Sequence, residues 1–96
     1  MGKLSAVEEL AESPKHVEGL DVDAAEDGYI IYQPEKDRVH FLNHTAVLIL
    51  ELCNGMNPVG AIADSIQEAF GLAERPEALV GETVARFRDE GLLAPE

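Results

Sequence analysis

Residues 44–53 form the most apolar stretch of this 96-residue chain, and they limit its possible folds more than any other feature. Asn43 stands before the stretch and can cap the free amides of a helix start, while Asn54 and Gly55 follow it as a stop signal. A helix that is apolar on nearly all sides must lie at the centre of a core. We therefore expect one small domain packed around a helix at His44–Cys53.

The sequence before this helix has the pattern of strands and tight turns. Residues 20–25 alternate between apolar and mostly acidic side chains, as in a strand with one buried side. The Asp-Gly pair at 27–28 predicts a turn, and the aromatic and β-branched residues at 29–32 predict a second strand. Pro34–Asp37 predicts another turn, before a third strand at Arg38–Leu42. The three strands should form an antiparallel meander.

Two more helices are predicted after the apolar one. A cap residue followed by proline at 57–58 is typical of a helix start, and we expect this helix to end at Phe70, before Gly71. The last helix should run from Glu77 to about Glu90, before Gly91. The helical spacing predicts two buried stripes: Val59, Ile62, Ile66, Ala69 and Phe70 in the first of these helices, and Leu79 or Val80, then Val84 and Phe87, in the second.

Three strands followed by three helices indicate an α+β domain with a small sheet against a helix layer. The same parts make up a winged-helix domain, and the pattern alone does not choose a topology. The domain should comprise residues 19–96, preceded by an acidic tail at residues 1–18. Leu4, Val7 and Leu10 in that tail have the spacing of a short amphipathic helix, which Pro14 would end.

The charge of the chain limits its partners. It carries 19 acidic and 7 basic residues, a net charge of −12. Such a field repels phosphate backbones and anionic lipids, so we expect neither nucleic acid nor membrane as a partner. A basic protein partner is compatible, although an acidic surface also serves solubility. Because no apolar run reaches about 18 residues and residues 1–13 lack the pattern of a signal peptide, we expect a cytoplasmic protein.

None of the reactive side chains forms a recognisable catalytic or metal-binding pattern. His40 and His44 are four residues apart, but a strand-to-helix junction separates them and no third ligand is near in sequence. Cys53 ends an apolar helix and is expected to be a buried thiol rather than a nucleophile. We therefore expect a non-enzymatic protein without metal or cofactor.

Two alternative functions are compatible with parts of the sequence. Asp64-Ser65-Ile66 is similar to the phosphopantetheine attachment signature of acyl carrier proteins, which are also small and acidic. However, Ser65 falls in mid-helix and the strands at 20–42 do not suit an all-helical carrier. A DNA-binding winged helix is the other alternative, and the net charge argues against it.

The third strand offers an interaction site of a different kind. A three-stranded sheet has two edges, and an exposed edge can accept a guest strand through main-chain hydrogen bonds. Val39 and Phe41 should point to one face, and His40 and Leu42 to the other. From the sequence pattern alone, a binding edge and a short edge strand that binds nothing are equally good explanations.

Residues 28–93 resemble the PqqD family, the peptide chaperones also called RiPP recognition elements. The resemblance rests on three segments in the right order and spacing: VHFLNHTA at 39–46, LELCNG at 50–55 and the terminal EGLL at 90–93. It continues in the helix that starts at Val59 and ends at Phe70. The family commonly has Asp where this chain has Asn54, a change that keeps the capping chemistry.

This resemblance implies a winged-helix-like fold and a function in peptide modification. Family members bind the leader segment of a ribosomally made precursor peptide and deliver it to a modifying enzyme, often a radical SAM enzyme, without catalysis of their own. The leader adds as a strand beside the third strand and lies against the third helix, so the main chain of residues 39–41 would pair with it. The implied peptide-binding residues are Arg38, Val39, His40, Phe41, Leu42, Val80, Thr83, Val84, Arg86 and Phe87. A homodimer through the same edge is a further possibility.

Overall fold

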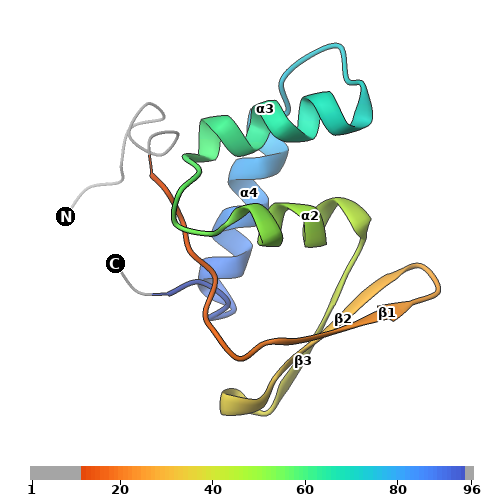
Figure 1. The fold of residues 1–96 in the computed structure, drawn as a ribbon, viewed down its shortest axis with the longest axis vertical. Helices are drawn as coiled ribbons and strands as arrows, with labels where there is room; N and C mark the ends of the chain where they lie inside the picture. The colour runs from red at the N-terminus through yellow and green to blue at the C-terminus, as the bar shows by residue number, and fades with distance from the viewer. Residues whose placement is uncertain (1–11, 95–96) are drawn as a thin grey trace.

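The computed structural model describes residues 12–94 and has the predicted order of elements (Figure 1). The elements are β1 (Asp21–Ala25), β2 (Gly28–Gln33), a 3-10 turn (Pro34–Lys36), β3 (Arg38–Leu42), α2 (His44–Leu52), α3 (Val59–Phe70) and α4 (Glu77–Asp89). All three strands are antiparallel, in the order β1-β2-β3. The predicted α+β class and meander are confirmed, whereas the likeness to a winged helix stays a prediction.

The register of the sheet divides its side chains between two faces. Ile31 lies opposite His40, and Ile30 lies opposite Phe41. Residues directly opposite each other in an antiparallel pair share a face. Ile31 and His40 are buried, so they lie on the inner face that packs against the helices, and the exposed Ile30 and Phe41 lie on the outer face.

Helix α2 lies between the sheet and the other helices, as its apolar sequence predicts. The Asn43 side chain accepts a hydrogen bond from the amide of Ala46 at 2.8 Å and caps the helix start. The helix packs against β2 and β3 on one side and against α3 and α4 on the other. The buried core includes Ile31, Leu42, Ile49, Leu50, Cys53, Ile62, Ile66, Val80, Phe87 and Leu92.

The first strand forms where predicted, but its expected buried side is wrong. Val22 is 51% exposed and Ala24 is also exposed. Helix α2 covers β2 and β3, while the β1–β2 hairpin extends beyond the end of the helix layer (Figure 1). Only Leu20, just before β1, packs against the core. Alternation in the sequence therefore identified a strand whose two faces are both largely open.

The buried stripe of α3 is shorter than predicted. Val59, Ile62 and Ile66 are buried, but Ala69 and Phe70, in the last turn of α3, are exposed. The helix start also differs: the side chain of Asn57 does not cap it, but donates a hydrogen bond to the carbonyl of Leu52 at 3.1 Å.

Residues 12–18 are part of the packed structure. The amide of His16 donates to the carbonyl of Cys53 at 2.7 Å, and the amide of Ala94 donates to the carbonyl of Lys15 at 2.7 Å. The amide of Gly55 donates to the carbonyl of Pro14 at 2.9 Å. The segment thus joins the end of α2 to the C-terminal residues. The helix predicted around Leu4, Val7 and Leu10 lies outside the described residues, and the boundary at residue 19 stays a prediction.

Candidate functional site

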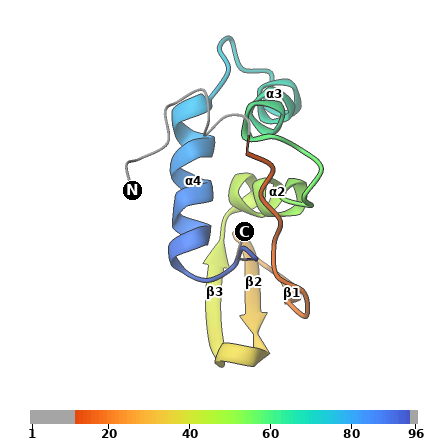
Figure 2. The same cartoon turned by 90° about the vertical axis from the view of Figure 1, so that its left-hand side faces the viewer.

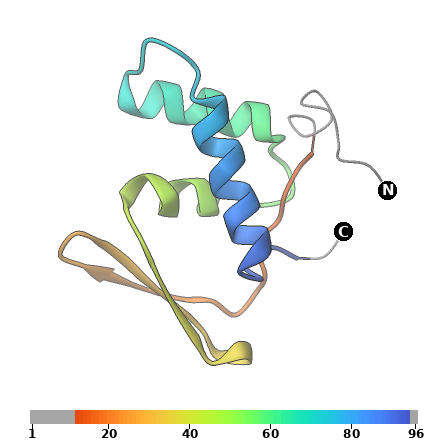
Figure 3. The ribbon, with the colours of Figure 1, turned by 180° about the vertical axis from the view of Figure 1, so that it is seen from behind.

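The two edges of the sheet have different surroundings. Strand β1 is one edge and β3 is the other, and α4 stands on the β3 side of the molecule (Figures 2 and 3). No helix in the described residues makes more than a few contacts with β1. A strand added to β3 would lie on the side of the molecule where α4 stands, whereas a strand added to β1 would lie near residues 16–20 and one side of α2.

The register indicates which main-chain groups of β3 face outward. Ala25 and Gly28 are partners on either side of a two-residue turn, so this pair exchanges hydrogen bonds. Hydrogen-bonded and non-hydrogen-bonded pairs alternate along a ladder. Counting along β2, the main-chain groups of His40 face Ile31 in β2. Those of Val39 and Phe41 face the open edge, so they rather than His40 are available to a guest strand.

Gly28 allows the sheet to meet the start of α2. Its φ angle is not in the left-handed region, so the residue is not required by backbone conformation. Instead, a Cβ at this position would clash with the carbonyl oxygen of Leu42 and would lie 3.1 Å from the Cα of Asn43. A side chain here would push β2 away from the end of β3, where the candidate site begins.

The side chains of β3 alternate as predicted. Val39 is 66% exposed and Phe41 is 53% exposed, both on the outer face, whereas His40 and Leu42 are buried on the inner face. Arg38 is exposed at the start of the strand. Only Arg38, Val39 and Phe41 among the predicted β3 residues therefore have side chains that a ligand can reach readily.

Helix α4 presents two different sides, and the predicted peptide-binding residues fall on both. Val80, Val84 and Phe87 are fully or almost fully buried in the core, so a peptide wall formed by their side chains does not fit the structure. Thr83 is half-buried and Arg86 is exposed. The helical period correctly grouped the first three residues, but they face the core, where α4 packs against α2 and α3, instead of the surface.

A hollow of about 300 Å³ lies between the starts of α2 and α4, next to the end of β3. Thr83 and Arg86 line it together with residues that the sequence did not single out as ligands: Asn43, Thr45, Ala46 and Leu79. Leu79 is 46% exposed, although it was a candidate for the buried stripe. The sequence did hold a signal for this exposure. Neighbouring residues of a helix point about 100° apart, so Leu79 and Val80 cannot both lie at the centre of the buried side. We call this hollow, with the open edge of β3, the β3–α4 groove.

A buried polar cluster closes the other end of the groove. The side-chain amide nitrogen of Gln33 donates to the carbonyl of Gly91 at 2.9 Å. The side-chain oxygen of Gln33 lies 3.2 Å from Nε2 of His40. Nδ1 of His40 lies 3.3 Å from the Glu90 carboxylate. Both ring nitrogens thus face oxygen atoms of neighbouring side chains. The cluster ties β3 to the end of α4.

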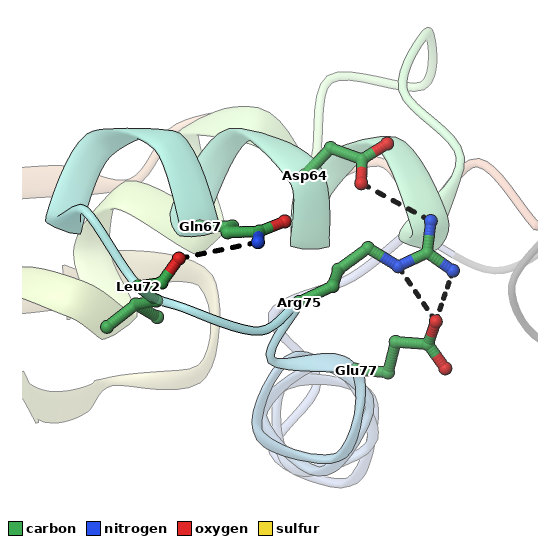
Figure 4. Close-up of polar contacts among 5 residues, drawn as sticks. All are labelled: Asp64, Gln67, Leu72, Arg75 and Glu77. Atoms are coloured by element: carbon green, nitrogen blue, oxygen red, sulfur yellow. Dashed lines mark hydrogen bonds and ion pairs between the residues drawn. The ribbon is translucent and has the colours of Figure 1, made fainter.

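Arg75 holds the start of α4 beside α3. Its guanidinium lies 3.3 Å from the carboxylate of Asp64 and also forms an ion pair with Glu77 (Figure 4). The side-chain amide of Gln67 donates to the carbonyl of Leu72 at 3.3 Å in the same loop. These contacts are solvent-exposed and stabilise little by themselves, but they help to orient the α4 turn that carries Leu79.

The side chains considered for chemistry do not converge on the groove. His44 is exposed and makes an edge-to-face contact with the ring of Tyr29 at 5.4 Å. Cys53 is fully buried, and desolvation raises the pKa of its thiol to about 11, with the nearby Arg88 acting in the opposite direction. The thiol is therefore protonated near neutral pH. Ser65 is exposed in the middle of α3. Among residues 12–94, no group of three or more His, Cys, Asp or Glu side chains could hold a metal ion.

The described part of the chain is a small α+β domain with an open sheet edge beside a helix. Its sequence matches the family model of PqqD, coenzyme PQQ synthesis protein D, over residues 28–93. The chain belongs to the PqqD family, as the sequence resemblance predicted. Searches of curated proteins and of solved structures found no match. No helix within residues 12–94 is long and apolar enough to cross a membrane.

Proposed function

We propose that this chain binds the leader segment of a ribosomally synthesised precursor peptide and presents it to a modifying enzyme. The leader adds as a strand to β3 and lies in the β3–α4 groove. The observation that carries the proposal is the open β3 edge, where the main chain of Val39 and Phe41 faces outward. The strand leads at Asn43 into the hollow that Leu79, Thr83 and Arg86 line. Membership of a family named for coenzyme synthesis fits this role.

In the β3–α4 groove, the main chain and the side chains have different roles in binding. Main-chain hydrogen bonds to Val39 and Phe41 give affinity for any extended peptide, while the hollow selects side chains at alternate positions of the guest. Leu79 offers apolar contact, and Thr83 is small enough to let the guest approach. Arg86 already pairs with Glu90 at 3.2 Å, so an acidic leader residue would compete with that pair. The chain itself performs no chemistry in this proposal.

The test is a titration of the leader peptide encoded next to this gene, labelled and followed by fluorescence anisotropy. Absence of binding at about 100 μM would falsify the proposal, since modest specific contacts give micromolar affinity. Replacing Thr83→Glu should fill the hollow and weaken binding about tenfold or more. The matched control is Ala85→Glu, because Ala85 is exposed on another side of α4, by Val84 and Arg88. Equal effects of the two variants would remove the groove assignment.

A further inference from the structure

The outer face of the sheet has no role in the proposal so far, and it is unusually apolar for a surface open to solvent. The register aligns two cross-strand rows on it: Asp23, Ile30 and Phe41 in one, and Asp21, Tyr32 and Val39 in the other. Ile30 is 39% exposed, Val39 is 66% exposed and Phe41 is 53% exposed. Helix α2 packs against the opposite face. Contiguous exposed apolar residues of this kind mark interaction sites in soluble proteins.

The outer face is also polarised in charge. Asp21 and Asp23 stand at its β1 side, and the apolar side chains stand at its β2 and β3 side. Over residues 21–42 the chain has six acids (21, 23, 26, 27, 35 and 37) against two bases (36 and 38). The only described hydrogen bond of a side chain on this face joins the Tyr32 hydroxyl to Asp37 at 3.1 Å. A complementary surface would have an apolar centre and basic residues opposite the two aspartates.

We infer that this outer face is the docking surface for the modifying enzyme, through an apolar patch on the enzyme flanked by lysine or arginine. The inference rests on the proposed function, because that function requires an enzyme that receives the leader. The face continues directly into the groove. A leader strand beside β3 would place every second side chain on the same face, next to Val39 and Phe41. The enzyme would then contact the sheet and the leader as one surface.

A second copy of this chain suits the face less well. Each copy carries a net charge of −12, and two outer faces brought together would place their aspartates in the same interface. Like charges held close oppose association. A basic enzyme surface gains from the same aspartates, and it leaves the β3 edge free for the leader.

The experiment compares two outer-face variants with two matched controls. Ile30→Ser removes apolar contact from β2, and its control is Val22→Ser, because Val22 is 51% exposed on the other face of β1. Asp23→Lys reverses a charge on the face, and its control is Asp27→Lys in the hairpin turn. Binding to the purified modifying enzyme encoded in the same gene neighbourhood is measured by biolayer interferometry, with and without saturating leader peptide. Circular dichroism checks the fold of each variant.

Both outer-face variants should weaken enzyme binding about tenfold or more, as expected for central interface residues. The two controls should remain within about twofold of the original chain, and leader affinity should remain within about twofold in all four variants. The original chain should bind the enzyme more tightly when leader is present.

Other outcomes overturn the inference in recognisable ways. Unchanged enzyme binding in both outer-face variants assigns the enzyme to another surface. Leader binding by the original chain without any enzyme binding overturns this inference and leaves the proposed function intact. If the original chain binds the enzyme but not the leader, and the four variants behave as predicted, the proposed function is overturned and the docking surface stands. A dimer seen by light scattering and lost in Ile30→Ser would assign the face to a second copy. If Ile30→Ser fails to fold, the exposed Asp23→Lys decides the outcome.

Discussion

The two edge strands of the sheet differ in what surrounds them more than in their length. On β1, the outward main-chain groups belong to Val22 and Ala24, both exposed, and the strand also carries Asp21 and Asp23. The hollow beside Val22 is lined by residues 16–20 and by α2, and α4 is not part of it. On β3, the open edge lies next to the wall formed by α4 and the start of α2. Charged and isolated edges resist pairing, whereas an edge beside a wall can select its guest. An open edge strand alone therefore does not identify a binding site. The residues of α4 and of the start of α2 near β3 distinguish this edge from β1.

The largest effects should come from substitutions on the buried and the exposed side of α4. Val80→Ala removes a fully buried side chain and should lower the free energy of unfolding by about 1–3 kcal/mol. Leu79→Ala, one residue earlier and 46% exposed, should change stability by less than about 1 kcal/mol but weaken leader binding several-fold. Urea unfolding and leader titration of both variants give the comparison. A Leu79→Ala variant with unchanged leader affinity would exclude Leu79 from the wall.

Proline substitutions compare the two edges directly. Val39→Pro removes an outward amide of β3 and places a ring where the guest strand would lie, so leader affinity should fall about tenfold or more. Val22→Pro makes the same change on the outward side of β1 and should leave leader affinity within about twofold. Both variants should cost similar stability, which urea unfolding measures. Equal losses of leader binding in the two would contradict the distinction between the edges.

The smallest effect concerns the polar cluster that ties β3 to α4. Glu90→Ala leaves Nδ1 of the buried His40 without its carboxylate and should lower the free energy of unfolding by about 1–2 kcal/mol. Leader affinity should change by no more than a few-fold, because the main-chain groups of Val39 and Phe41 remain in place and, of the described side chains that line the hollow, only Arg86 loses a partner. Glu82→Ala, exposed on the same helix, serves as the control. An unchanged stability in Glu90→Ala would show that the cluster does not hold the edge in place.

The sequence predicted the elements well because their signals are local. The apolar run at α2, the cap at Asn43 and the alternation within β3 each depend on residues within one or two turns. The alternation of apolar and acidic residues correctly predicted strand β1, but the buried side that it also predicted is wrong. Whether one face of a strand is buried depends on how far the helix layer extends over it. Nothing local in the sequence shows that Ala69 and Phe70, at the end of α3, are exposed.

The candidate site could be predicted only in part for the same reason. Helical spacing grouped Val80, Val84 and Phe87 on one side of α4, but the resemblance was needed to suggest a groove, and it did not say which side faces the peptide. The contacts of His40 with Glu90 and of His16 with Cys53 join residues far apart in sequence. Their spacing carries no periodic signal, so only the packed structure brings them together.

Amide hydrogen exchange with and without the leader peptide tests the central claim most directly. If the leader adds to β3, the amides of Val39 and Phe41 acquire hydrogen-bond partners and should exchange at least about tenfold more slowly in the complex. The amides of Val22 and Ala24 on β1 should exchange at unchanged rates. Slower exchange at Val22 and Ala24, or binding of the leader without slower exchange at Val39 and Phe41, would contradict strand addition at β3.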